Sequence, residues 1–178
     1  MTGVDISKPG PLMAGKRGLV MGVANERSIA WGIARLLAAH GAELAFTYQG
    51  GAFGRRAEPL AKSVGSKIIE ECNVLDSASV ENVFNRVKDE WGSLDFVVHA
   101  LAYSDPRELN GRYVDTTRDN FTNTMVISCY SFTEVARLAA PLMTRSRNAA
   151  VSPITFSAAK RQRAARSAWR PSPPSASA

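Results

Sequence analysis

The sequence predicts an α/β fold in which a parallel sheet is covered by helices. Short apolar runs alternate with longer stretches of helical periodicity from residue 17 to residue 142. Strands separated by helices pair in parallel through right-handed crossovers. The length of 178 residues and the hydrophobic fraction of 45% suffice for one domain with a proper core. Four strand–helix units therefore fill this segment.

The four predicted strands are short runs rich in apolar residues and bounded by glycine or polar residues. The fourth is the most plainly buried, because its centre is Phe96-Val97-Val98. In chain order the predicted strands are 18–22, 43–48, 67–72 and 94–100.

The first two predicted helices follow from the spacing of apolar residues and from glycine signals. Apolar residues recur at helical spacing from Ile29, and Gly41 ends the pattern. The loop at 50–54 is rich in glycine and leads into a second helix that runs through Leu60.

The third and fourth helices have clearer apolar faces. Asp76 or Ser77 caps the third, and a long fourth helix follows the polar stretch 104–116 and spans 117–140. The residues that mark the two apolar faces are Val80, Val83, Phe84 and Val87, and then Phe121, Met125, Phe132 and Val135.

The net charge of +6 is unevenly distributed along the chain. Residues 1–143 carry 15 of the 22 basic residues and all 16 acidic ones, whereas residues 144–178 carry the other seven basic residues and no acid. The tail also holds nine alanines, seven serines and four prolines. This composition predicts a disordered basic tail at 144–178, in which Ala149–Phe156, interrupted by Pro153, could add one poor strand. If no such strand forms, the buried fourth strand becomes an open edge.

Several classes of protein are excluded by what the sequence lacks. Residues 1–14 form a short extension without the apolar segment of a signal peptide, and no apolar run is long enough to cross a membrane. Cys72 and Cys129 show neither disulfide nor metal-ligand spacing, so we expect two buried structural thiols and no metal. A cytoplasmic protein is expected.

The loop after the first strand is a candidate phosphate-binding turn. It lies at the carboxyl end of a parallel strand, and the following helix offers free N–H groups to an anion. Gly22 would permit the tight turn, Ser28 could cap the helix or bind a phosphate, and Gly32 would let the helix pack closely. The usual G-x-G-x-x-G spacing is absent, so an ordinary capped turn fits the same residues.

The end of the second strand is where such a fold reads the adenosine ribose. Gln49 stands there, and Arg55 and Arg56 follow shortly after. The arginines could meet a 2′-phosphate, or they could simply be exposed at the start of a helix. The residues alone leave NADH and NADPH both open.

Seven runs of residues carry a family resemblance: GKRGLVMGVAN at 15–25, SIAWGIA at 28–34, GAELAFTYQ at 41–49, LDFVVHALA at 94–102, GRYVDTT at 111–117, YSF at 130–132 and APLM at 140–143. In this order they resemble the NADH-dependent enoyl-[acyl-carrier-protein] reductases of bacterial fatty-acid synthesis, in the short-chain dehydrogenase/reductase superfamily. The resemblance covers residues 13–143.

The resemblance implies both a fold and a reaction. The fold is a Rossmann-type doubly wound parallel sheet in strand order 3-2-1-4, with residues 15–143 as a partial NAD-binding domain. The reaction is reduction of the C2=C3 double bond of an enoyl-acyl carrier protein by hydride transfer from NADH. Members of the family are usually homotetramers that use the long helix.

The resemblance also assigns binding roles. Asn73 stands where the family usually has Asp, and its amide oxygen can still accept a hydrogen bond from the adenine amino group. Val126 likewise replaces an Asp of the long helix. The implied NADH contacts are Gly22, Ser28, Ile29, Gln49, Asn73, Val74 and Leu101, and the implied substrate-side residue is Ser104.

The residues that perform the family's chemistry have no match. The family uses a first tyrosine, a second tyrosine ten residues later and a lysine seven after that, to hold the developing enolate and the nicotinamide ribose. No tyrosine follows Tyr130, and Lys160 is the only lysine of the tail. We therefore assign no catalytic residue and expect no turnover.

Three interpretations of the tail remain open. A change of reading frame near Thr144 is favoured, because the resemblance stops abruptly and the codons of residues 152–155, read one base earlier, can spell Leu-Thr-Tyr-Tyr. A natural basic tail could instead bind nucleic acid or a membrane through residues 160–170. A different catalytic segment is the third possibility.

Overall fold

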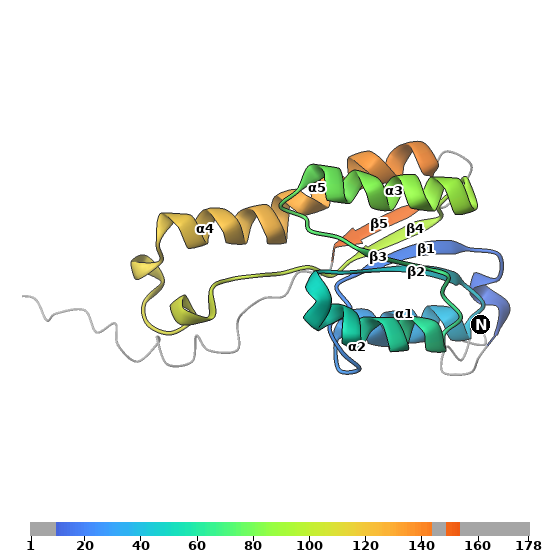
Figure 1. The fold of residues 1–178 in the computed structure, drawn as a ribbon, viewed down its shortest axis with the longest axis horizontal. Coiled ribbons are helices and arrows are strands. Elements are labelled where there is room, and N and C mark those ends of the chain that lie inside the picture. The colour runs from blue at the N-terminus through green and yellow to red at the C-terminus, as the bar shows by residue number, and fades with distance from the viewer. Residues whose placement is uncertain (1–9, 144–148, 154–178) are drawn as a thin grey trace, which may run out of the picture.

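A computed structural model describes residues 10–143 and 149–153 and shows a parallel five-stranded sheet between two helical layers (Figure 1). The strand order is β3-β2-β1-β4-β5, so the predicted α/β class and the order 3-2-1-4 are confirmed. The strands are β1 Arg17–Met21, β2 Glu43–Tyr48, β3 Ile68–Glu71, β4 Phe96–His99 and β5 Ala150–Pro153.

The two faces of the sheet are covered by different pairs of helices. The helices α1 (Ile29–Ala39) and α2 (Gly50–Ser63) cover one face, and α3 (Ser77–Trp91) and α5 (Ser131–Ala139) cover the other (Figure 1). Because side chains alternate along a strand, β1 sends Val20 into the first layer and Leu19 into the second. Both side chains are fully buried. Burial on both faces explains why the central strands are apolar at consecutive positions.

The start of α2 differs from the prediction. The glycine-rich stretch 50–54, expected as a loop, is the first turn of a helix that continues past Leu60 to Ser63 and contains Pro59. Tertiary packing accounts for this, because Gly54 is buried against the ring of Tyr48 and a Cβ there would lie 2.8 Å from Cε2. Packing against β2 therefore outweighs the weak helix propensity of glycine.

The ends of α1 and α3 show which expected caps form. The carboxylate of Asp76 accepts a hydrogen bond from the N–H of Ala78, so the predicted cap of α3 is confirmed. Ser28 holds the corresponding place before α1, but its hydroxyl donates to the carbonyl of Asn25 at 2.7 Å and does not cap the helix. Gly32 is exposed, with nothing within 4 Å of a built Cβ, so the close packing expected there is absent.

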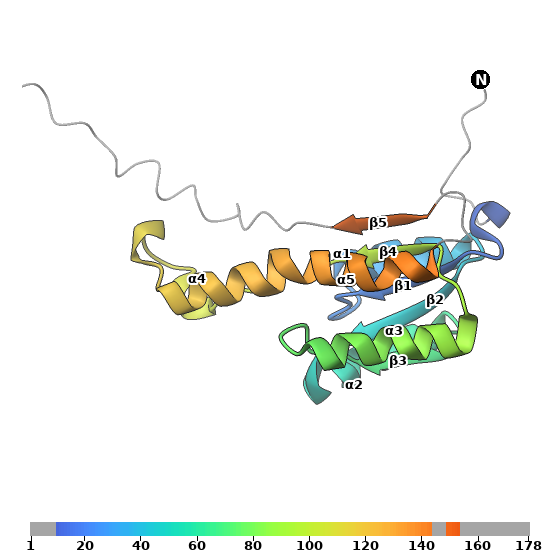
Figure 2. The same cartoon turned by 90° about the horizontal axis from the view of Figure 1, so that it is seen from above.

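The predicted long helix forms as one continuous helix of three segments (Figure 2). The helix α4 (Arg118–Met125) continues through a π-helical segment, Val126–Tyr130, into α5. Phe121 and Met125 are about half exposed, so the apolar face predicted along the whole helix is buried only in its second half. The reason is visible in Figure 1, where α4 extends beyond the end of the sheet.

The start of α5 is joined to β4 by a buried hydrogen bond between Ser131 and His99. The hydroxyl of Ser131 donates to the carbonyl of Ile127 at 2.6 Å, and His99 Nε2 lies 2.8 Å from the same hydroxyl. Since the Ser131 proton is directed to Ile127, His99 donates through Nε2. Burial lowers the pKa of His99, because desolvation penalises the charged imidazolium.

The strand β5 is the poor strand that the sequence suggested at 149–156. It pairs in parallel with β4, with Val97 opposite Val151 and His99 opposite Pro153, and only Val151 packs against the core. The rest of the predicted disordered tail lies outside the described residues. The edge of β4 is not open, because β5 pairs with it. Within the described residues, β5 is the edge strand of the sheet. Among the described helices, none has the length and apolar character needed to cross a membrane.

Candidate functional site

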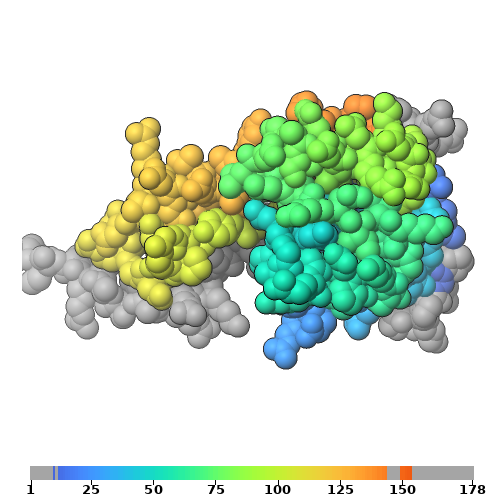
Figure 3. All heavy atoms as spheres, viewed as in Figure 1, coloured from blue at the N-terminus to red at the C-terminus, as the bar shows by residue number. Residues whose placement is uncertain are grey.

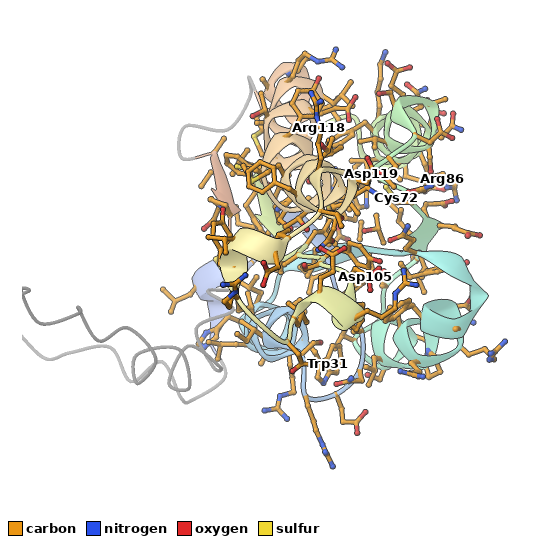
Figure 4. All side chains as sticks on the ribbon, turned by 90° about the vertical axis from the view of Figure 1, so that its left-hand side faces the viewer. Trp31, Cys72, Arg86, Asp105, Arg118 and Asp119 are labelled. Atoms are coloured by element: carbon orange, nitrogen blue, oxygen red, sulfur yellow. The ribbon has the colours of Figure 1, made fainter. Side chains whose placement is uncertain are left out.

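A cleft opens where the carboxyl ends of the strands meet. Because β1, β2, β3 and β4 are parallel, their ends lie at one edge of the sheet, which faces the viewer in Figure 4. The cleft has a volume of about 190 Å³. It is lined by Met21, Gly22, Val23, Ala24, Thr47, Tyr48, Gln49, Phe53, Cys72, Val74, Ala100, Leu101, Ala102, Tyr103 and Ile127.

The turn after β1 forms one wall of the cleft. Gly22 has a φ of +98°, and a Cβ at this position would overlap the carbonyl oxygen of Ala100. The backbones of β1 and β4 are in contact at this point, since the N–H of Ala100 donates to the carbonyl of Met21 at 3.1 Å. Only glycine satisfies both the backbone conformation and the close approach.

Ser28 and Ile29 lie at the start of α1, outside the cleft lining. Ile29 is 46% exposed, and Ser28 is half-buried. The loop that leads to them is ordered by its own backbone and by Asn25, whose side-chain oxygen accepts the N–H of Arg27 at 2.8 Å. These residues therefore present the first turn of α1 beside the cleft rather than inside it.

The ends of β2 and β3 bring two predicted residues into contact. The side-chain amide of Gln49 donates to Asn73 Oδ1 at 3.2 Å, and the N–H of Leu75 donates to the same oxygen at 3.1 Å. Val74 is buried and lines the cleft beside them. The Asn73 oxygen therefore already receives two hydrogen bonds.

An acidic residue that the sequence analysis did not single out lies next to this pair. Glu71 is opposite Tyr48 in the register of β3 and β2, and its Oε1 accepts the N–H of Gly50 at 3.2 Å. Burial raises the pKa of Tyr48, and the carboxylates of Glu58, Glu71 and Glu70 raise it further. Three carboxylates therefore lie near the β2–α2 turn.

Leu101 and Ser104 follow β4 but occupy different places. Leu101 lines the cleft, whereas Ser104 belongs to a segment that runs along α4. Asn120 on α4 is buried and holds this segment, because its side-chain oxygen accepts the N–H of Asp105 at 2.9 Å and its amide donates to Ser104 Oγ at 3.3 Å. Figure 3 shows the resulting lobe projecting from the sheet body.

Two cysteines differ in their surroundings. Cys72 is buried at the cleft, between the two helical layers in Figure 4, whereas Cys129 is exposed on the π-helical segment. The expectation of two buried thiols therefore holds only for Cys72. Burial raises the pKa of Cys72 to about 11, helped by the nearby carboxylates of Glu134 and Asp76 and opposed by a hydrogen bond with Ser79.

Sequence patterns gave no signal for several residues of the cleft. Ile127 reaches it because the π-helical segment lies beside the ends of the strands, and Phe53 reaches it because α2 begins earlier than predicted. The predicted residues that line the cleft are Gly22, Gln49, Val74 and Leu101. They come from four different segments of the chain.

A family model and several known proteins match most of the length of this chain. A family model described as Enoyl-(Acyl carrier protein) reductase matches residues 22–171. Enoyl-[acyl-carrier-protein] reductase [NADH] 2 of Rhizobium meliloti (strain 1021) is 64% identical over 132 residues, which are 74% of this chain and 49% of that protein. The chain therefore spans about half the length of this relative.

Solved structures give the same result in three dimensions. The reductase of Anaplasma phagocytophilum in complex with NAD superposes with a TM-score of 0.73 at 55% identity, covering 76% of this chain and 52% of that one. The Bacillus cereus enoyl-acyl carrier protein reductase with NADP+ and indole naphthyridinone gives a TM-score of 0.72 at 41% identity, covering 75% and 52%.

The two thiols are expected to differ strongly in reactivity. Since only the thiolate reacts, a pKa of about 11 leaves about a thousandth of Cys72 ionised at pH 8. We expect iodoacetamide to modify Cys129 first and Cys72 at least ~100-fold more slowly in the folded protein. Peptide mass spectrometry over time measures both rates, and urea-unfolded protein is the control in which the rates converge. Equal rates in the folded protein would contradict the buried position of Cys72.

Proposed function

The chain belongs to the enoyl-[acyl-carrier-protein] reductase family, and on this premise we propose that it binds NADH in the cleft at the carboxyl edge of its sheet. The observation that carries the proposal is the convergence of Gly22, Gln49, Val74 and Leu101 on one cleft. The family resemblance assigned each of them to the cofactor, and they are separated by 27, 25 and 27 residues along the chain. Parallel strands are the reason that such distant residues meet.

The parts of the cofactor are assigned to different walls of the cleft. The turn at Gly22 and the start of α1, at Ser28 and Ile29, are proposed to hold the pyrophosphate, because the first turn of a helix favours anions. The N–H of Ser28 itself donates to the carbonyl of Asn25, so the donors would be the N–H groups that follow it. Val74 and Asn73 are proposed to hold the adenine. Gln49 is placed toward its ribose, and Leu101 toward the nicotinamide side.

The size and lining of the cleft fit part of a dinucleotide. A volume of about 190 Å³ is below the ~300 Å³ at which enclosed cofactor sites usually begin. We therefore propose that the cleft encloses one portion of NADH and that the rest lies along open surface. Fewer enclosing contacts predict weak binding.

We also propose the family's substrate and its homotetrameric assembly for this chain. An enoyl-acyl carrier protein would approach from the side of Ser104, on the projecting lobe. Phe121, Met125 and Tyr130 are exposed on the long helix, and a homotetramer built on that helix would cover them. A cytoplasmic location is proposed with the family assignment.

The alternative of nucleic-acid binding depends on the basic tail. Its candidate residues at 160–170 lie outside the described part of the chain. That function predicts DNA affinity that falls steeply with salt and disappears when residues 144–178 are deleted.

Replacing Gly22 is expected to weaken NADH binding strongly. A side chain at this position requires an unfavourable φ and overlaps Ala100, so the Gly22→Ala turn must move away from the cleft. Titration by NADH fluorescence should show at least about a tenfold loss of affinity. Gly65→Ala is the matched control, because Gly65 also has a positive φ but a built Cβ has nothing within 4 Å. If both variants fold, by circular dichroism, and bind NADH equally, the proposed site is wrong.

A carboxylate in place of Asn73 is expected to tighten NADH binding. The Asn73 oxygen already accepts from Gln49 and Leu75, whereas Asn73→Asp keeps these bonds and supplies a second oxygen for the adenine amino group. We expect an affinity gain of about three- to tenfold by calorimetry. Asn85→Asp, an exposed position on α3, makes the same charge change away from the cleft and should leave the affinity unchanged. An equal response of the two variants would refute the adenine contact.

Hydride transfer to an enoyl thioester is not expected from this chain. Bound NADH supplies the hydride, but the developing enolate needs a proton donor and a positive charge nearby. The sequence has no tyrosine after Tyr130 to pair with Lys160. NADH absorbance at 340 nm with crotonyl-CoA should therefore fall no faster than in buffer, and a Rhizobium relative serves as the active control. Turnover well above the buffer rate would show that another segment supplies the missing groups.

A further inference from the structure

The choice between NADH and NADPH is not decided by family membership. One similar solved structure contains NAD and another contains NADP+. The two cofactors differ only in a phosphate on the adenosine 2′-oxygen. A residue that discriminates between them must therefore lie where the protein reads that ribose, at the end of the second strand.

In this chain the end of the second strand leads directly into α2. The chain passes from Tyr48 through Gln49 to Gly50, the first residue of the helix. The first N–H groups of a helix have no partner within it, and they carry the positive end of its dipole. They would be natural donors to a 2′-phosphate.

Glu71 already occupies one of these donors. Its carboxylate accepts the N–H of Gly50 at 3.2 Å, and the register of β3 against β2 fixes it beside Tyr48. The preceding residue, Glu70, points to the other face of the sheet, where it pairs with Arg86 at 3.5 Å. Because side chains alternate along β3, the carboxylate of Glu71 lies at the start of α2, whereas that of Glu70 lies on the opposite face.

Resting on the proposed NADH site, we propose that Glu71 makes this chain selective for NADH by placing a negative charge where the 2′-phosphate of NADPH would bind. A carboxylate there repels a phosphate, but it can accept a hydrogen bond from the free 2′-hydroxyl of NADH. Gln49, next to it at the edge of the cleft, offers that ribose a neutral partner.

The charges around Glu71 agree with this role. The pKa of Tyr48 is raised by burial and also by the carboxylates of Glu58, Glu71 and Glu70, so these three carboxylates lie close to the end of β2. Arg55 and Arg56 are the opposing charges on α2. Both are exposed and neither forms an ion pair within the described ranges. Glu71 is exposed as well, but the N–H of Gly50 holds its carboxylate at the start of α2.

The test compares two neighbouring glutamates. Glu71→Gln removes the charge while its amide oxygen can still accept the N–H of Gly50, and Glu70→Gln makes the same change on the opposite face. Affinities for NADH and NADPH are measured by fluorescence titration at low ionic strength, where charge effects are largest. We expect the wild type to prefer NADH, and Glu71→Gln to raise the NADPH/NADH affinity ratio about tenfold or more. Glu70→Gln should change the ratio far less, because the Glu70 carboxylate pairs with Arg86 on the opposite face.

The possible outcomes separate this inference from the proposed function. If the wild type binds NADPH as tightly as NADH, or if both glutamine variants change the ratio equally, Glu71 is not the discriminating residue although NADH binding stands. A wild-type preference for NADPH that is lost in a double Arg55→Gln, Arg56→Gln variant and kept in Glu71→Gln would assign the choice of cofactor to the arginines. If neither dinucleotide binds to the wild type or to Glu71→Gln, the proposed function and this inference both fail.

Discussion

The parallel pairing of β1 with both β2 and β4 is the constraint on which the rest of the structure depends. Residues Gly18–Met21 of β1 are paired on both sides, and both faces of the strand are buried. Its neighbours run in the same direction, so every loop that leaves a carboxyl end emerges at one edge. The cleft is a consequence of this geometry, because no single strand supplies more than a few of its lining residues.

Buried polar contacts then position the helices around this sheet. The hydroxyl of Ser77 donates to the buried carboxylate of Glu134 at 2.7 Å and joins α3 to α5. The His99–Ser131 pair joins β4 to the first residue of α5. A buried group that lacks a partner is costly, so these bonds favour one position of the long helix over others. That position brings Ile127 to the cleft.

Family membership and catalytic capacity are separate properties of this chain. The turn at Gly22 and the residues at the ends of β2, β3 and β4 form the cleft that we propose for the cofactor. The chemistry of an enoyl reduction needs groups that stabilise an enolate, and those groups follow the fifth strand in the family. Here β5 ends at Pro153, and only Val151 of this strand packs against the core.

The sequence by itself determined the four central strands and their parallel pairing, because apolar runs and turn glycines are local signals. The family resemblance supplied their order and the proposed cofactor residues. Local signals also limited the cap of α3 to Asp76 or Ser77, of which the structure selects Asp76. Only the tertiary structure decided that 50–54 is helical, that the long helix contains a π-helical segment, that Cys129 and Gly32 are exposed, and that Glu71 reaches Gly50. Each of these depends on the packing of segments distant in sequence. The residues next to a position along the chain do not specify which distant segment will contact it.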